Sequence, residues 1–180
     1  MKQITIILLL LSIFILGQNI KSQAQSDSVE HIEKLNHFYK YKDFYISAQP
    51  NLETLEWLKS EGVTTIINLR SEKEIEKFTK DAFNEKNYVI KLKMNYLSIP
   101  VGDMDSYSKE NLKKMAKTIP NKGKTLIHCT SAGRATKFFI AYLVKYENYS
   151  LQEAIAVGKQ MRFSFPLENL LDKEISFTIK

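Results

Sequence analysis

The feature that most constrains the fold is the run of residues 63–69, which reads Val-Thr-Thr-Ile-Ile-Asn-Leu. β-Branched and aliphatic side chains follow one another here with little polar alternation, as is typical of a strand covered on both faces. An amphipathic helix carrying Leu52, Leu55 and Leu58 is expected just before it, ending at Gly62. A doubly covered strand next to such a helix indicates helices packed on both sides of a sheet.

The rest of the chain repeats this alternation of strand and helix. Further strands are expected over residues 44–47, 95–101 and 124–128, and helices starting near Ser28, Ser71, Ser108, Gly133 and Ser150. The helix from Ser28 is expected to end near Asn36, and the helix from Ser71 to continue, with a break, to about Lys86. We therefore predict an α/β fold with a mainly parallel central sheet flanked by helices, in one domain over residues 43–180.

The N-terminus has the pattern of an export signal. Met1-Lys2 gives a positive start, Ile4 to Leu16 is almost entirely aliphatic, and Ser22-Gln23-Ala24 fits a signal-peptidase site. The apolar run is about 13 residues, shorter than the roughly 20 needed to span a bilayer, although an uncleaved anchor is the alternative. We expect residues 1–24 to be a signal peptide and 25–42 an N-terminal extension. The mature protein is then exported, periplasmic or secreted, without a stable membrane anchor.

Composition narrows the possible partners. The chain has 26 Lys+Arg and 20 Asp+Glu residues, a formal charge of +6, and cleavage after Ala24 would remove two of the lysines. The basic residues alternate with acidic ones instead of forming a stripe, so nucleic-acid binding is not expected. One cysteine and three scattered histidines exclude a disulfide framework and the common zinc patterns. We expect no metal and no cofactor, and the sequence leaves the oligomeric state open.

Chemistry concentrates where the strand over 124–128 gives way to a helix. The turn begins with the only cysteine, Cys129, and ends with Arg134 at the start of the helix. The positive end of the helix and the arginine both favour a thiolate, the reactive form of cysteine. Arg134 suits bidentate contact with phosphoryl oxygens. The amides expected to bind the same oxygens belong to Thr130, Ser131, Ala132 and Gly133. The alternative is that Cys129 is an inert core residue.

Four motifs occur in an order that resembles a known family. They are Ser47-Ala48-Gln49-Pro50, Ile66-Ile67-Asn68-Leu69-Arg70, Ile99-Pro100-Val101-Gly102-Asp103 and His128-Cys129 to Gly133-Arg134. Together they resemble the cysteine-based dual-specificity/tyrosine phosphatase superfamily. The likeness is to its compact bacterial branch, related to domains described as β-lactamase-hydrolase-like or as DSP-PTPase fused to NAD kinase. The similarity runs from about Phe44 to Met161.

The resemblance implies a role for each matching residue. Cys129 would be the nucleophile that forms a phosphocysteine, and Arg134 with the loop amides would hold the phosphate. Asp103 would be the general acid, with Asp105 as the second candidate. Support for the loops is expected from His128, Thr136 and Arg70, the last through an ion pair. Without the resemblance, either aspartate would be interpreted as a solvated loop carboxylate or a helix cap.

The loop departs from the superfamily's commonest form. Four residues separate Cys129 from Arg134 instead of five, and Ala135 stands where a hydroxyl residue is usual. Thr136 or Ser131 could supply that hydroxyl. The short loop also resembles that of rhodaneses, so a sulfurtransferase with a Cys129 persulfide is one alternative and a weakly catalytic phosphate-binding module is another. The favoured interpretation is an exported phosphomonoesterase of the protein-tyrosine or dual-specificity type, acting on a phosphorylated protein or small molecule.

Overall fold

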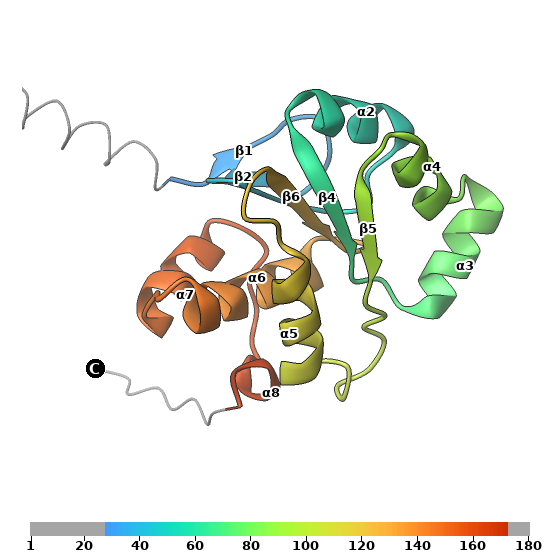
Figure 1. Cartoon of the computed structure of the whole chain (residues 1–180). Helices are drawn as coiled ribbons and strands as arrows, with labels where there is room; N and C mark the ends of the chain where they lie inside the picture. Colours follow the sequence, from blue (N-terminus) through green and yellow to red (C-terminus); the bar gives the residue numbers. More distant parts are fainter. Residues whose placement is uncertain (1–27, 173–180) are drawn as a thin grey trace, which may run out of the picture.

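The computed structural model of the chain describes residues 28–172, so the expected signal peptide lies outside the described residues. Strands and helices alternate along this range (Figure 1). The strands are β1 (Glu30–His31), β2 (Phe38–Tyr41), β3 (Phe44–Ser47), β4 (Val63–Asn68), β5 (Asn95–Ser98) and β6 (Lys124–His128). The helices are α2 (Leu52–Ser60), α3 (Glu72–Asp81), α4 (Glu85–Lys91), α5 (Lys109–Thr118), α6 (Gly133–Tyr146), α7 (Leu151–Lys159) and α8 (Glu168–Leu171).

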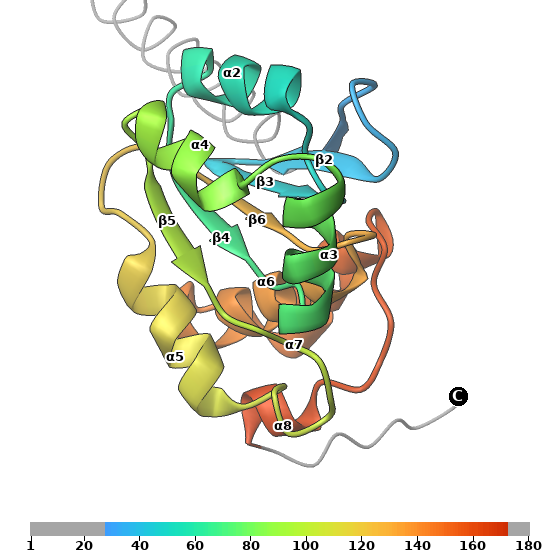
Figure 2. The same cartoon turned by 90° about the vertical axis from the view of Figure 1, so that its right-hand side faces the viewer.

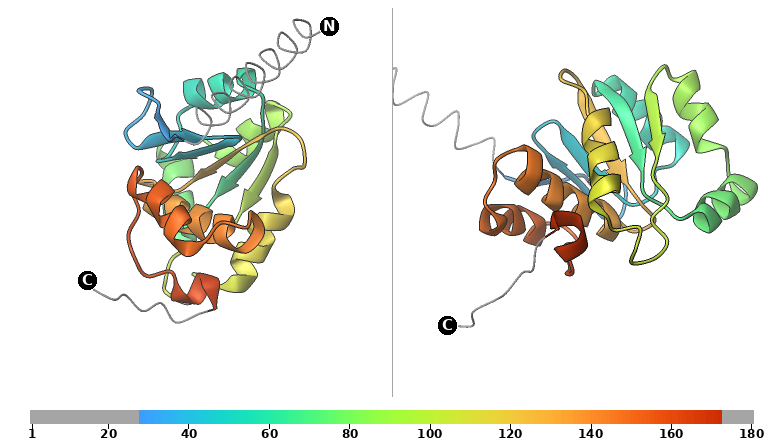
Figure 3. Two further views of the ribbon diagram at one scale, coloured as in Figure 1. Left: turned by 90° about the vertical axis from the view of Figure 1, so that its left-hand side faces the viewer. Right: turned by 60° about the horizontal axis from the view of Figure 1, so that its bottom comes forward.

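The strands form one sheet in the order β1-β2-β3-β6-β4-β5. The neighbours β3, β6, β4 and β5 run parallel, whereas β1, β2 and β3 pair antiparallel. The hairpin of β1 and β2 lies at the edge opposite β5 (Figure 3). The prediction of an α/β fold with a mainly parallel sheet is confirmed, and β6, which leads into the cysteine turn, lies inside the sheet.

Helices cover both faces of this sheet, as Figures 1 and 2 show. On one face, Leu55 and Leu58 of α2 and Val89 of α4 pack against apolar residues of β3, β4 and β6. The other face is covered by α5, α6, α7 and α8, and α6 contributes a buried core that includes Phe138 and Phe139. Helix α3 buries no residue fully and lies at the end of the sheet to which the parallel strands point.

The expected helix from Ser28 to Asn36 is wrong. Glu30–His31 instead pair with β2, and the Ile32 amide donates to the Phe38 carbonyl at 2.8 Å. The apolar residues at the expected helical spacing do pack, but against different parts of the core. Val29 contacts the cluster under α6, whereas Ile32 packs with the cluster under α2. The extension predicted over 25–42 thus supplies two strands to the domain's own sheet.

Candidate active site

The turn after β6 lies at the centre of the parallel part of the sheet. The amide of Cys129 donates to Ser47 at the end of β3, at 3.3 Å, and the Leu69 amide after β4 donates to the His128 carbonyl at 2.8 Å. The turn is therefore attached on both sides to the carboxyl ends of neighbouring strands, where open α/β sheets bind their ligands. Cys129 itself is buried, with 1% of its surface exposed.

Helix α6 begins without the side-chain cap that the neighbouring helices have. Asn51, Ser71, Ser108 and Ser150 each accept a backbone N–H at the start of α2, α3, α5 and α7. At α6 the cap position is Ala132, which offers no side-chain acceptor and lies in the left-handed region with φ of 68°. That conformation costs alanine roughly 1–2 kcal/mol. The first amides of α6, which have no acceptor within the helix, can therefore bind an anion.

Arg134 is held at the mouth of this turn by Glu74. The guanidinium donates from Nη1 to Glu74 Oε2 at 2.7 Å and from Nη2 to Glu74 Oε1 at 2.6 Å, and Nη1 also donates to the Val101 carbonyl at 2.7 Å. The Thr130 hydroxyl donates to the same carboxylate at 2.6 Å. This bidentate pairing leaves the guanidinium one orientation, next to the uncapped end of α6.

The contacts between Arg134 and Glu74 favour the charged form of both side chains. The hydrogen bonds from Arg134 and Thr130 hold the pKa of Glu74 far below its usual range. Burial by itself would lower the pKa of Arg134, but its hydrogen bonds to Glu74 and the charge of Cys129 raise it. Arg134 therefore places a positive charge beside Cys129.

A second carboxylate, Glu85 at the start of α4, lies beneath the turn. Its oxygens are 3.0 Å from His128 Nε2 and 3.3 Å from Arg70 Nη2. Asn68 Nδ2 donates to it at 2.9 Å. Burial by itself would raise the pKa of Glu85, but His128 and Arg70 hold it below its usual value. The expected ion pair of Arg70 is present, and its partner is this buried carboxylate. Desolvation of the buried phenol and then the charge of Glu85 raise the pKa of Tyr96 to about 12.

The candidate acid Asp103 lines the same pocket as Arg134. The two residues line a cavity of about 530 Å³ together with Glu74, Met104 and Tyr107. The carboxylate of Asp103 accepts the Ser106 amide at 2.9 Å, and hydrogen bonds to Ser106 lower the pKa of Asp103.

Among the described residues, Asp105 does not line this pocket. Because it lines the pocket, Asp103 is the better placed of the two candidates for the general acid.

The hydroxyl candidates occupy different places. Thr136 is buried and donates to the Ala132 carbonyl at 3.0 Å, so it supports the strained cap residue from inside the helix. Ser131 is exposed and forms a backbone bridge with Ala48. Gly133 does not have a positive φ, and a Cβ built there meets no atom within 4 Å. The residue of the turn that lies in the left-handed region is Ala132.

Sequence reasoning missed the two glutamates of the site. The spacing of Ser71 and Glu74 indicates only a capping box for α3, which Glu74 does form while it also binds Arg134. Its place just after a parallel strand adjacent to β6 is a signal that could have identified it. Glu85 had no comparable signal, because it lies on a short helix and reaches the site only through the packing of α4 on the sheet.

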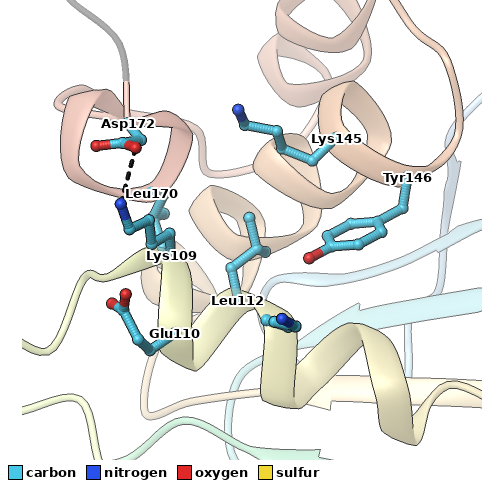
Figure 4. A pocket seen from close by; sticks show the side chains of 8 residues that line it. Lys109, Glu110, Leu112, Lys145, Tyr146, Leu170 and Asp172 are labelled. Atoms are coloured by element: carbon cyan, nitrogen blue, oxygen red, sulfur yellow. Dashed lines mark hydrogen bonds and ion pairs between the residues drawn. The ribbon is translucent and has the colours of Figure 1, made fainter.

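Another cavity, of about 350 Å³, lies between α5, α6 and α8 and is lined by Lys109, Lys113, Lys145 and Tyr146 (Figure 4). Lys109 forms an ion pair there with Asp172 at 2.9 Å. None of the predicted site residues lines this cavity. Within residues 28–172, no cluster of three or more His, Cys, Asp or Glu side chains is suited to hold a metal ion. No helix in the same range is both long and apolar enough to cross a membrane.

Comparisons with known proteins agree with this geometry. The sequence profile of the family described as DSP-PTPase phosphatase fused to NAD+ kinase matches residues 18–165. No curated protein matches the chain.

Several solved structures share its fold. PTPMT1 has 23% identity and a TM-score of 0.60, over 72% of this chain and 87% of that one. Tk-PTP in its active form has 21% identity and a TM-score of 0.55, over 66% and 79%. TpbA of P. aeruginosa has 17% identity and a TM-score of 0.55, over 71% and 75%.

Proposed function

The chain belongs to the family of DSP-PTPase phosphatases fused to NAD+ kinase, and on this premise we propose that it hydrolyses phosphate monoesters through a phosphocysteine on Cys129. One observation carries the proposal. The only thiol, the uncapped start of α6 and the Arg134 guanidinium meet in one turn at the carboxyl ends of the parallel strands. Such a turn can bind three phosphoryl oxygens and present a nucleophile to the phosphorus.

In the first step the Cys129 thiolate attacks phosphorus, so that an S–P bond forms and the P–O bond to the leaving group breaks. The amides at the start of α6 and Arg134 stabilise the charge on the equatorial oxygens. Asp103 gives its proton to the leaving oxygen. In the second step a water molecule, losing a proton to Asp103, attacks the phosphocysteine and releases inorganic phosphate and the thiolate.

Asp103 must be protonated for the first step, whereas its hydrogen bonds to Ser106 favour the carboxylate in the free protein. A bound phosphate dianion changes this balance, because a nearby like charge raises the pKa of a carboxyl group. We therefore assign the acid role to Asp103 in the substrate complex, where the loop that carries it also closes one side of the pocket.

Two solved structures of similar fold suggest where to look for a substrate. One is a cysteine-to-serine variant of TpbA in complex with pTyr, and another is PTPMT1 in complex with PI(5)P. An aryl phosphate is the simpler first probe. The match to a phosphatase family also favours hydrolysis over the sulfurtransferase alternative raised by the short loop.

Hydrolysis of p-nitrophenyl phosphate by the reduced protein in EDTA tests the proposal. We expect turnover that Cys129→Ser abolishes and that Asp103→Asn slows by about 100-fold or more, in line with the contribution of general acids. Asp105→Asn is the matched control and should retain activity. A folded, reduced protein that binds phosphate but shows no turnover would exclude the enzyme and favour the binding module.

We also propose that the protein is exported, which the N-terminal pattern of Met1-Lys2, the aliphatic run to Leu16 and the small residues Ser22 and Ala24 supports. Mass spectrometry of the protein recovered from outside the cytoplasm should show a chain beginning at Gln25. An intact N-terminus on cytoplasmic protein would contradict this.

A further inference from the structure

Glu85 has a contact set that the proposed reaction does not use. Its side chain is 2% exposed, and every group facing its two oxygens is a hydrogen-bond donor. Oε1 faces His128 Nε2 at 3.0 Å and accepts from Gln49 Nε2 at 3.3 Å. Oε2 accepts from Asn68 Nδ2 at 2.9 Å, Arg70 Nη2 at 3.3 Å and the Tyr96 hydroxyl at 3.5 Å. A buried carboxylate with this many donors is held rigidly in its ionised form.

These donors come from the strands that carry the active-site turn. Gln49 follows β3, Asn68 ends β4 and His128 ends β6, so one carboxylate from α4 ties together three neighbouring strand ends. The same strand ends contact the turn through their backbone: the Gln49 amide lies 3.5 Å from the Thr130 carbonyl. A change in the position of Glu85 would therefore reach the turn directly.

The short distance between Glu85 and His128 indicates which ring nitrogen of His128 carries a proton. A carboxylate oxygen and an unprotonated ring nitrogen would repel each other at 3.0 Å, so Nε2 of His128 must carry hydrogen. Neither ring nitrogen of His128 makes an aligned hydrogen bond with a described residue, so the 3.0 Å contact with Glu85 is what distinguishes Nε2, and nothing on the Nδ1 side imposes the other tautomer. Glu85 is the group that selects the tautomer of the residue preceding Cys129.

We infer that Glu85 is a positioning residue for the active site: through the 3.0 Å contact of its carboxylate with Nε2 of His128, it fixes the orientation and tautomer of that ring beneath Cys129. This inference rests on the proposed phosphatase function for its catalytic consequence. Arg70, Asn68 and Gln49 hold the carboxylate in place, and Glu85 acts on the nucleophile through His128.

The substitution Glu85→Gln separates this role from simple packing, because the amide has nearly the same shape but only one acceptor oxygen. Its NH2 group must face either Arg70, which donates to the carboxylate, or His128 Nε2, which lies 3.0 Å from it. Arg70 has no acceptor, whereas His128 can become one by moving its proton from Nε2 to Nδ1. The variant is therefore expected to switch the tautomer of His128 while keeping the fold.

The first test is ¹⁵N NMR of histidine-labelled full-length protein, in which His128→Asn identifies the resonances of that ring among the three histidines. Nε2 of His128 should be protonated in the wild type, and Nδ1 in Glu85→Gln at neutral pH. An unchanged tautomer in a folded Glu85→Gln protein, or Nδ1 protonation in the wild type, would overturn the inference.

The second test is kinetic and uses p-nitrophenyl phosphate. We expect Glu85→Gln to lower kcat by about 10- to 100-fold, since small displacements in an active site have effects of this size, and to change KM by less than about threefold. Glu61→Gln is the matched control, because Glu61 accepts from the Tyr45 hydroxyl at 3.3 Å near Lys124, where β6 begins, away from the turn. It should retain kcat.

A double-mutant comparison decides whether Glu85 acts through His128. In a His128→Asn background, Glu85→Gln should change kcat by less than about twofold, because the group it positions is absent. Fully additive effects would show that Glu85 acts by another route. If the wild type hydrolyses nothing, the proposed function fails, but the tautomer and the alkylation rate of Cys129 by iodoacetamide still decide the positioning role. An alkylation rate equal to that of the wild type would then count against it.

Discussion

Two arginine–glutamate pairs flank the active-site turn, and they differ mainly in burial. The lower pair, Arg70 with Glu85, has side chains 3% and 2% exposed, whereas the upper pair, Arg134 with Glu74, has side chains 17% and 34% exposed. The lower pair is surrounded by further donors from the strand ends. The upper pair borders an open pocket of about 530 Å³.

The difference in burial indicates different roles for the two pairs. In the lower pair, neither partner can be solvated if the other is lost, so the pair is a fixed part of the sheet. In the upper pair, water and ligands reach both groups, so Arg134 can direct part of its hydrogen-bonding capacity to a phosphate while Glu74 holds its orientation. In the proposed function, the same two residue types serve folding in one place and ligand binding in the other.

The largest effect on stability is expected from replacing Arg70, the cation of the lower pair. Arg70→Met should lower the free energy of unfolding by about 3–5 kcal/mol, because it leaves the Glu85 carboxylate buried without its guanidinium. Urea denaturation followed by circular dichroism measures this. Arg134→Met is the matched control at the upper pair and should cost no more than about 1 kcal/mol. Equal losses for the two variants would remove the distinction between the pairs.

Arg134→Lys should have the opposite pattern, with a large loss of activity and a small change in stability. Lysine keeps the charge but not the planar fork that contacts both Glu74 and a phosphoryl group, so kcat/KM for p-nitrophenyl phosphate should fall by about 100- to 1,000-fold. The free energy of unfolding should change by less than about 1 kcal/mol. Arg162→Lys, at an exposed arginine that contacts His37, is the control. A loss of tenfold or less would place phosphate binding mainly on the amides of α6.

The smallest effect concerns Glu74 and depends on pH. Because the pKa of Glu74 is lowered in the folded protein, its contribution to stability is present above the unfolded value of about 4.3 and is lost as pH falls below it. Glu74→Gln should therefore be less stable than the wild type by about 1 kcal/mol at pH 7, and the difference should shrink between about pH 5 and pH 3. Urea midpoints at several pH values measure it.

Glu76→Gln, on the exposed part of α3, is the matched control for this series. A difference between Glu74→Gln and the wild type that stayed constant down to pH 3 would show that the upper pair contributes no ionic stabilisation.

Local sequence determined most of the secondary structure near the site. The strand over 124–128 is predicted to the residue, and Ser71, Ser108 and Ser150 cap the helices that they were expected to cap. These features depend on residues at most four positions apart, which is why a pattern can identify them. The segment over 28–36 failed because its apolar spacing fits a helix, whereas pairing with β2 decides its conformation.

The sequence by itself therefore determined the α/β alternation, the family resemblance and the turn that joins Cys129 to Arg134. Only the tertiary structure decided which carboxylates accompany these groups. Glu74 lies 60 residues from Arg134 in the chain, and Glu85 reaches His128 only because α4 packs on the sheet. The local pattern places Glu74 in a capping box just after a strand, but it does not show that either glutamate faces a cation of the site, because their roles follow from burial and from the donors around them, which exist only after the strands have assembled.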